Sequence, residues 1–545
     1  MKKMRNVRRL ALLTALCAII SCGGAGSGNG TANNSSTPTN PGIPGTSSIM
    51  RTRITAPKFS ETNLGMLKIG ENVDYGVIKE DTKDGYPESF TSPITAISSY
   101  YEVKKNEIGI RILSRELKIG VPTIMDVRTG GVAIVYDYGS SPYFNFVKSD
   151  VRSLMRGIRQ INNLTLNMEP NSYLFMFTDA VVKLSETNLG DIMSETPISL
   201  RPTINGTDYK MFKFHKSYIM IDQNVNLDNP NDLYNQLIAT NSRIDIKPDI
   251  TILGTKDNQI GVQLIHNRNK YWNTDHNTNF GNIDLKGNNN IGVYAQASKF
   301  QNKGTISVGK NSTGMYMLPE EGNDTDNEMD YNFGAENLRV KNESEGTITL
   351  GENSTGMYIY KPWVDVPAVI INHGAIQSTE NNVTGMFANV RNQKSDPSDT
   401  DALQTVLGNA SGTWFSDGKG IELKGDKSIG MYSTGDAKYQ VMNYRSGKIV
   451  MGDSTDRSNP SIGIYNDNPN VTISNYGVIE IGKNSVGIAS LGGTVVNYSS
   501  DSSLILSQNG AINITGDGGI GMYLENGAKG TNDGKITTVG SKECS

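Results

Sequence analysis

Residues that commonly build metal and redox sites are scarce in this chain. Its 545 residues include only 3 cysteines and 4 histidines. Three cysteines exclude a disulfide framework and a cysteine-rich metal site. The histidines, His215, His266, His276 and His373, do not occur at metal-ligand spacings. We therefore expect no metal ion and no cofactor.

The chain also lacks an excess of charge of either sign. It has 51 Lys and Arg against 55 Asp and Glu, a net charge of -4, and the two signs are well mixed along the sequence. Proteins that bind nucleic acids or acidic lipid surfaces usually carry basic clusters. This composition therefore predicts no nucleic-acid partner.

The N-terminus carries an apolar run at residues 10–20, which is too short to span a bilayer. Basic residues precede it, so residues 1–21 are typical of a signal peptide. The run ends in Ile-Ile-Ser-Cys, which resembles a bacterial lipobox. That resemblance implies an acylated Cys22 as the first mature residue, attachment to a membrane through this lipid, and location at the outer membrane and cell surface. The alternative is an ordinary signal peptide cut nearby, after Ala25.

Two further segments follow before the regular part of the sequence. Residues 22–49 are rich in Gly, Ser, Asn and Thr and have few apolar residues, so they predict a flexible tether. Residues 50–245 contain strand-like runs and two helix-like stretches at 151–161 and 232–239. We interpret them as a β-rich or α+β N-terminal domain, with degenerate repeats as one form of it.

One phrase recurs over residues 246–545. In a representative copy, Gly-Thr-Ile-Ser-Val precedes a turn at 309–312, and Thr-Gly-Met-Tyr follows it. The alternation of Ile306 and Val308 with polar residues predicts a half-buried strand, and the same alternation places Thr313 and Met315 on one face of a second strand. The second strands of the copies occur at 260–262, 291–294, 313–316, 355–358, 384–387, 429–432, 462–465, 486–488 and 520–523.

Each copy is too short to bury its apolar face alone, and stacked copies bury a continuous core. The spacing between copies varies, which disfavours propellers and leucine-rich repeats. A parallel β-helix tolerates such variation because insertions leave at its corners. We therefore predict an all-β fold with a parallel β-helix solenoid in the C-terminal half.

The wording Asn-x-Gly-x-Ile followed by Gly-Met-Tyr, as at residues 302–316, resembles passenger domains of autotransporter (type V secreted) proteins from anaerobic Gram-negative bacteria. The resemblance implies a right-handed β-helix without enzymatic activity, and a role in adhesion or surface interaction. The partner would be a glycan or protein on a host or bacterial surface. The copy that begins at Gly534 lacks a second strand, so we expect an incomplete passenger. The alternative is a complete outer-membrane lipoprotein of structural role.

Two short segments resemble parts of catalytic or metal-binding motifs. Gly-Asp-Ser454 resembles part of a serine-protease motif but falls in the turn slot of a repeat, so we expect no catalytic residue there. The acidic residues Asp324, Asp326, Glu328 and Asp330 do not match a calcium loop and indicate a solvated loop. A surface polysaccharide-active enzyme remains the alternative function, because β-helices also host such chemistry.

An aromatic residue ends most copies of the phrase. Because Met315 is expected in the core, its neighbour should point outward. The predicted surface row contains Tyr294, Tyr316, Tyr358, Phe387, Tyr432, Tyr465 and Tyr523. Such a row either stabilises the stack or forms a contact surface, and we favour stabilisation.

The mature protein is predicted to begin at a lipidated Cys22. Burial of several acyl chains, at about 0.8 kcal/mol per CH₂ group, would hold it stably in a membrane. Mass spectrometry of the mature N-terminus measures this directly, and a free N-terminus at another residue would contradict it.

Overall fold

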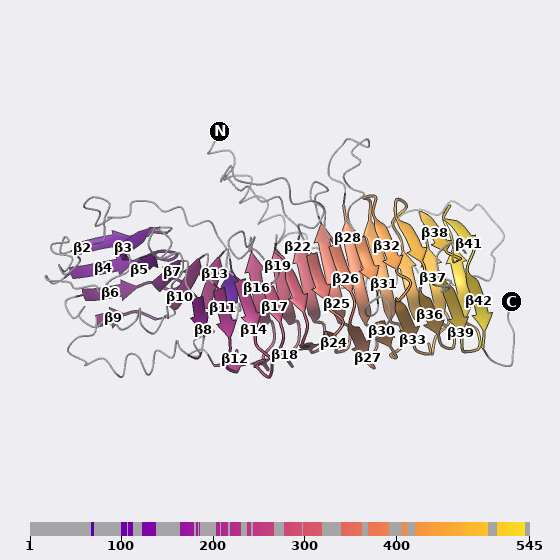
Figure 1. The fold of residues 1–545 in the computed structure, drawn as a ribbon, viewed down its shortest axis with the longest axis horizontal. Helices are drawn as coiled ribbons and strands as arrows, with labels where there is room; N and C mark the ends of the chain where they lie inside the picture. Colours follow the sequence, from indigo (N-terminus) through magenta and orange to yellow (C-terminus); the bar gives the residue numbers. More distant parts are fainter. Residues whose placement is uncertain are drawn as a thin grey trace, which may run out of the picture.

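The fold was analysed in a computed structural model. The structure describes residues 67–69, 100–105, 107–112, 123–137, 164–178, 181–183, 185, 203–207, 209–215, 218–229, 237–240, 243–265, 277–296, 298–318, 339–361, 369–391, 406–410, 420–499 and 510–539. These residues form parallel strands arranged in an elongated stack (Figure 1). No helix in this part of the chain is long and apolar enough to cross a membrane.

Four parallel sheets contain all the strands. Sheet 1, in spatial order, contains β3 (Ile108–Ile112), β5 (Val132–Asp137), β7 (Tyr173–Thr178), β10 (Lys210–His215), β13 (Leu237–Thr240), β1 (Leu67–Ile69), β16 (Ile260–Ile265), β19 (Ile291–Gln296), β22 (Thr313–Leu318), β25 (Thr355–Lys361), β28 (Thr384–Val390), β31 (Ile429–Gly435), β34 (Ile462–Asn466), β37 (Val486–Ser490) and β40 (Ile520–Leu524). Sheet 2 contains β8 (Val181–Lys183), β11 (Tyr218–Ile221), β14 (Arg243–Ile246), β17 (Asn277–Asn279), β20 (Phe300–Asn302), β23 (Arg339–Asn342), β26 (Val369–Asn372), β29 (Val406–Asn409), β32 (Gln440–Asn443), β35 (Thr472–Asn475), β38 (Thr494–Asn497) and β41 (Lys529–Asn532).

Sheet 3 contains β12 (Val225–Asn226), β15 (Thr251–Gly254), β18 (Asn282–Leu285), β21 (Thr305–Val308), β24 (Thr347–Leu350), β27 (Ala375–Ser378), β30 (Gly420–Leu423), β33 (Lys448–Met451), β36 (Val478–Ile481), β39 (Ala511–Ile514) and β42 (Lys535–Thr538). Sheet 4 contains β2 (Tyr100–Val103), β4 (Thr123–Val127), β6 (Leu164–Met168) and β9 (Thr203–Asn205).

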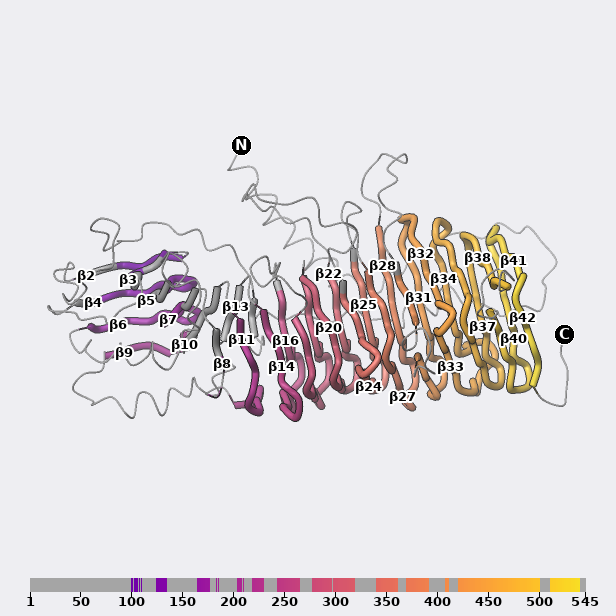
Figure 2. The backbone as a smooth tube through the Cα atoms, in the orientation of Figure 1, coloured from indigo at the N-terminus to yellow at the C-terminus, as the bar shows by residue number. Residues whose placement is uncertain are grey.

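From β14 onward, the chain visits sheets 2, 3 and 1 in turn, and each visit to all three makes one rung of a solenoid (Figure 2). This confirms the all-β parallel solenoid predicted for the C-terminal half. Sheet 1 has 15 strands, and at a spacing of about 4.8 Å its 14 intervals extend for roughly 67 Å.

The N-terminal part follows a related path. Strands β2, β4, β6 and β9 of sheet 4 each precede a strand of sheet 1, and sheet 1 continues without interruption past residue 245. In the described residues, this region therefore consists of β-rungs, and the α+β alternative is not observed. The helix expected at 232–239 is wrong at its end, because Leu237–Thr240 forms β13 and pairs with β10. The helix expected at 151–161 lies outside the described residues.

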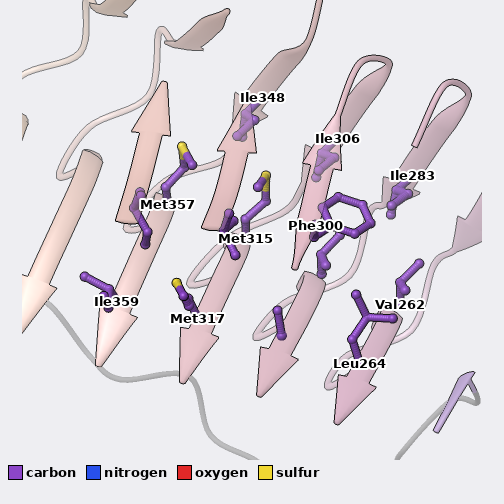
Figure 3. Packing of buried hydrophobic residues seen from close by; sticks show 14 of the residues in the cluster. Val262, Leu264, Ile283, Phe300, Ile306, Met315, Met317, Ile348, Met357 and Ile359 are labelled. Atoms are coloured by element: carbon purple, nitrogen blue, oxygen red, sulfur yellow. The ribbon is translucent and has the colours of Figure 1, made fainter. Parts of the chain in front are cut away.

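The core is built from columns of identical or similar residues. Sheet 3 stacks an isoleucine on every rung from Ile252 to Ile536, and sheet 1 stacks Val, Met or Ile from Val262 to Met522. Figure 3 shows part of this packing, with Met315 and Met357 of sheet 1 and Ile306 and Ile348 of sheet 3 in the interior. Each rung thus buries its apolar face against its neighbours, as the repeat predicted.

A column of asparagines, buried from Asn279 to Asn497 and exposed at Asn532, ends the strands of sheet 2. Each Nδ2 donates to the Oδ1 of the next asparagine along the stack, at 2.7–2.9 Å. The amides also donate to backbone carbonyls, as Asn409 does to Lys448 at 3.2 Å. Burial of unpaired amides would be costly, so these bonds are what make the column compatible with the core. This asparagine ladder contains Asn279, Asn302, Asn342, Asn372, Asn409, Asn443, Asn475, Asn497 and Asn532.

The glycine of each Gly-Met-Tyr phrase has no room for a side chain. A Cβ on Gly385 would lie 2.6 Å from the carbonyl oxygen of Gly430 and 2.8 Å from Cγ2 of Ile421. This glycine faces the core, as does the methionine that follows it, so the alternation of the strand is broken there. The residue before the glycine consequently faces outward.

The predicted pairing of Thr313 with Met315 on one face is therefore wrong. Thr313 aligns with Ile291, and Ile291 packs in the outer cluster with Tyr294, whereas Met315 is in the core.

The turns between sheets 3 and 1 use asparagine where the backbone is left-handed. Asn289, Asn311, Asn353 and Asn484 have φ between 51° and 57°. Asparagine adopts this region more easily than most residues. Gly309, in the same turn as Asn311, does not have a positive φ.

Replacement of Asn409 by alanine is expected to destabilise the stack. It removes the bonds to Asn372 and Asn443, at 2.9 Å each, and leaves their amides partly unpaired inside the core. We expect a loss of about 2–4 kcal/mol in the free energy of unfolding, measured by urea denaturation. Gln440→Ala, at an exposed position of the same sheet, is the control. Equal midpoints for the two variants would contradict a stabilising ladder.

Candidate functional site on the outer faces of the solenoid

The predicted lipidation site Cys22 lies outside the described residues. The acidic residues Asp324, Asp326, Glu328 and Asp330, interpreted above as a solvated loop, also lie outside them. Among the described residues, no group of three His, Cys, Asp or Glu side chains is placed to hold a metal ion. Two outer faces of the solenoid carry candidate sites.

The aromatic residues of the repeat form one continuous column along the outer side of sheet 1. Ring centroids on successive rungs, from Tyr294 to Tyr465, are 4.7–5.3 Å apart. That distance is close to the spacing of the strands, so each ring contacts the ring of the next rung. The column packs in a cluster separate from the core, together with Ile291 and Leu318.

The aromatic column is buried, contrary to the exposed surface expected from the sequence. Its relative exposure is 1–7% for Tyr294, Tyr316, Tyr358, Phe387, Tyr432 and Tyr465. Tyr523 is only partly buried. Strand alternation correctly places these side chains away from the core, but it does not describe what packs beside them. Six of the seven residues therefore offer little surface to a ligand.

The hydroxyls of this column include two, on Tyr358 and Tyr432, whose pKa values are raised by burial. Tyr432 donates to Asp467 at 3.0 Å, and Tyr294 donates to Gln296 at 3.0 Å. Burial, followed by the nearby Asp467 carboxylate, raises the pKa of Tyr432. Burial is also the main cause that raises the pKa of Tyr358. These hydrogen bonds and raised pKa values are those expected of tyrosines that pack against one another in the stack.

A groove of about 580 Å³ lies on the outer face of sheet 3. Its floor is made by Ser307 and Thr349, which align on neighbouring strands, and by Gly309 and Gly351 in the turns that follow. These residues are small, so the surface is hollow between larger neighbours. The groove is the second candidate site.

The groove walls carry longer polar side chains. Lys286 pairs with Asp284 at 3.5 Å on one side, and Lys424 pairs with Glu422 at 2.8 Å on the other. The hydrogen bond to Glu422 raises the pKa of Lys424, so the ammonium stays charged. Between the walls, Gln377 donates to Thr349 Oγ1 at 3.3 Å. The groove therefore offers hydroxyl and amide groups to a ligand, and the charged side chains on either side of them are paired in ion pairs.

Ser454 is buried inside a turn. Its Oγ accepts from the backbone N–H of Ser461 at 2.6 Å and lies 3.4 Å from the hydroxyl of Ser485. The position of Ser312 and Ser354, directly before the second strand, is filled on this rung by Ser461, whose hydroxyl likewise accepts from the N–H of the preceding rung. Ser454 lies in the turn before it, and its hydroxyl is used in a bond within that turn.

Sequence reasoning missed the groove. Alternation indicated that Ser307 faces outward, but the hollow depends on the residues that flank it on neighbouring rungs. Aligning the copies rung by rung would have shown the contrast in side-chain size, since the same slot holds Asp284, Ser307, Thr349, Gln377 and Glu422.

Comparisons with protein-family models, with curated proteins and with solved structures found no match to this chain.

Truncation of a buried ring should destabilise the aromatic column. Tyr432→Ala removes contacts with Phe387 and Tyr465 and leaves a cavity, for an expected loss of about 3–5 kcal/mol. Tyr432→Phe keeps the ring and loses the hydrogen bonds of the hydroxyl, chiefly the one to Asp467, so we expect a loss of about 1 kcal/mol. Urea denaturation measures both losses, and equal losses would contradict a packing role for the ring.

The buried tyrosines should also make stability depend on alkaline pH. The pKa values of Tyr358 and Tyr432 are raised in the folded state, whereas tyrosine in an unfolded chain ionises at about pH 10. Their contribution to stability is therefore fully present below that pH. It is lost as the pH rises above it, because only the unfolded chain releases these protons. Thermal melts of Tyr358→Phe/Tyr432→Phe should show a shallower loss above pH 10 than the original chain. An identical slope would contradict this assignment.

Proposed function

We propose that this chain is a non-enzymatic cell-surface rod that mediates adhesion or another surface interaction. It would be exported through its signal peptide and attached to the outer membrane by a lipid on Cys22. The resemblance of the repeat motif to autotransporter passengers supports this proposal. The signal-peptide-like segment at residues 1–21 and the lipobox-like sequence before Cys22 support it as well.

The observation that carries the proposal is the uninterrupted register of the solenoid. Columns of Ile in sheet 3, of Val, Met or Ile in sheet 1 and of Asn in sheet 2 hold successive rungs in fixed alignment. A scaffold of this kind presents outer side chains at regular intervals along a stiff body. Such extended surfaces are what solenoid proteins use to bind partners.

A polysaccharide-active enzyme is the competing function. The acidic side chains Asp284 and Glu422 in the groove each pair with the lysine that follows their strand. The groove floor consists of small hydroxyl residues and glycine. These features suit binding better than acid–base catalysis, which requires a positioned acid and base.

Beads coated with the purified mature chain test the proposed function. We expect them to adhere to host or bacterial cells at least about tenfold above beads coated with an unrelated protein, a difference of roughly 1.4 kcal/mol. Oligosaccharides incubated with the same protein should remain intact in a reducing-end assay. Background adhesion together with cleavage would favour the enzyme instead.

A further inference from the structure

The hollow on sheet 3 results from a local change in side-chain size along one column. The third position of successive strands holds Asp284, Ser307, Thr349, Gln377 and Glu422. Ser307 and Thr349 are the smallest of these residues, and they lie on adjacent rungs between longer side chains. The result is a groove that crosses several rungs and is open to solvent.

Hydroxyl groups dominate the floor of the groove. The hydroxyls of Ser307 and Thr349 each donate one hydrogen bond and accept others, and both side chains are half-buried. The amide of Gln377 borders them and already donates to Thr349. A ligand that alternates donors and acceptors, as sugar hydroxyls do, complements such a floor.

The charges around the groove disfavour an anionic ligand. Asp284, Glu380 and Glu422 face two cations, Lys286 and Lys424, so acids exceed bases by one. Both lysines are within 3.5 Å of an acid in the strand that they follow. A sulfated chain or a nucleic acid would therefore meet a slightly negative surface, whereas an uncharged chain would meet no electrostatic penalty.

A peptide is also a poor match to this surface. Extended peptides commonly bind by adding a strand to an exposed sheet edge. The strands beneath the groove, from β18 to β30, are each paired on both sides within sheet 3. Their backbone groups are used by the sheet, so only side chains are available to a ligand.

The rung spacing matches an extended chain lying along the solenoid. From β18 to β30 there are four strand intervals, or about 19 Å at roughly 4.8 Å each. A pyranose unit has a length close to one interval, so successive units would meet equivalent slots. We propose that this groove binds a segment of a neutral oligosaccharide. This rests on the proposed surface-binding function and names its ligand class.

The test measures binding of the full mature chain to β-linked glucose and N-acetylglucosamine oligomers of four to six units, with heparin as the acidic probe. We expect saturable binding to a neutral oligomer and little change with salt. Thr349→Trp fills the floor and should weaken binding at least about tenfold. Asn513→Trp places the same side chain in the same slot on β39, beyond the groove, and should leave affinity unchanged.

Circular dichroism and melting temperature must show that both variants are folded as the original chain is. Equal affinity of the two tryptophan variants would overturn the location. Binding of heparin alone, with strong salt dependence, would overturn the neutral ligand. Failure to bind any oligomer, while coated beads still adhere to cells, would overturn this inference and leave the proposed function intact. Loss of adhesion to cells would instead count against the function.

Discussion

In-register stacking of parallel rungs is the constraint on which this structure depends. From β14 onward, each strand lies directly above the equivalent strand of the previous rung, so each residue meets the residue at its own position in the next copy. Isoleucine therefore packs on isoleucine and asparagine bonds to asparagine. The same rule excludes a side chain at the glycine of each phrase, because the next glycine carbonyl already occupies that space. A polar residue such as asparagine is tolerated in the core only because the next rung has the same residue to hydrogen-bond with it.

This constraint divides the sequence into an interior that must repeat and an exterior that is free to vary. The inward slot of sheet 3 is isoleucine on each rung from Ile252 to Ile536, while the outward slot changes from acid to hydroxyl to amide. The groove lies where this outward slot becomes small. Binding properties can therefore change on the outer face without loss of the stack, which separates the requirements of folding from those of recognition.

The sequence was sufficient to predict the fold of the C-terminal half, because the repeated phrase carries both strand alternation and turn residues. It was insufficient for details that depend on neighbours. Thr313 was placed on the wrong face because the strand is irregular at the adjacent glycine. Tyr358 was expected at the surface because strand alternation shows which way a side chain points. It does not show whether other side chains cover it. The groove at Ser307 and Thr349 was missed because its shape comes from adjacent copies. The rungs before residue 245 lack the phrase, so the sequence suggested degenerate repeats there only as one form of a β-rich or α+β domain.

The asparagine ladder gives the rod an electrical direction. Every amide in it donates toward the C-terminal neighbour and accepts from the N-terminal one, so the side-chain dipoles point the same way along the axis. Aligned hydrogen bonds polarise one another in an interior of low dielectric constant. The ladder thus resembles, in side chains, the aligned peptide dipoles of an α-helix. Its positive end points toward the C-terminal rungs, and its negative end toward the N-terminal ones, so the two ends of the stack differ electrostatically even where their sequences are alike.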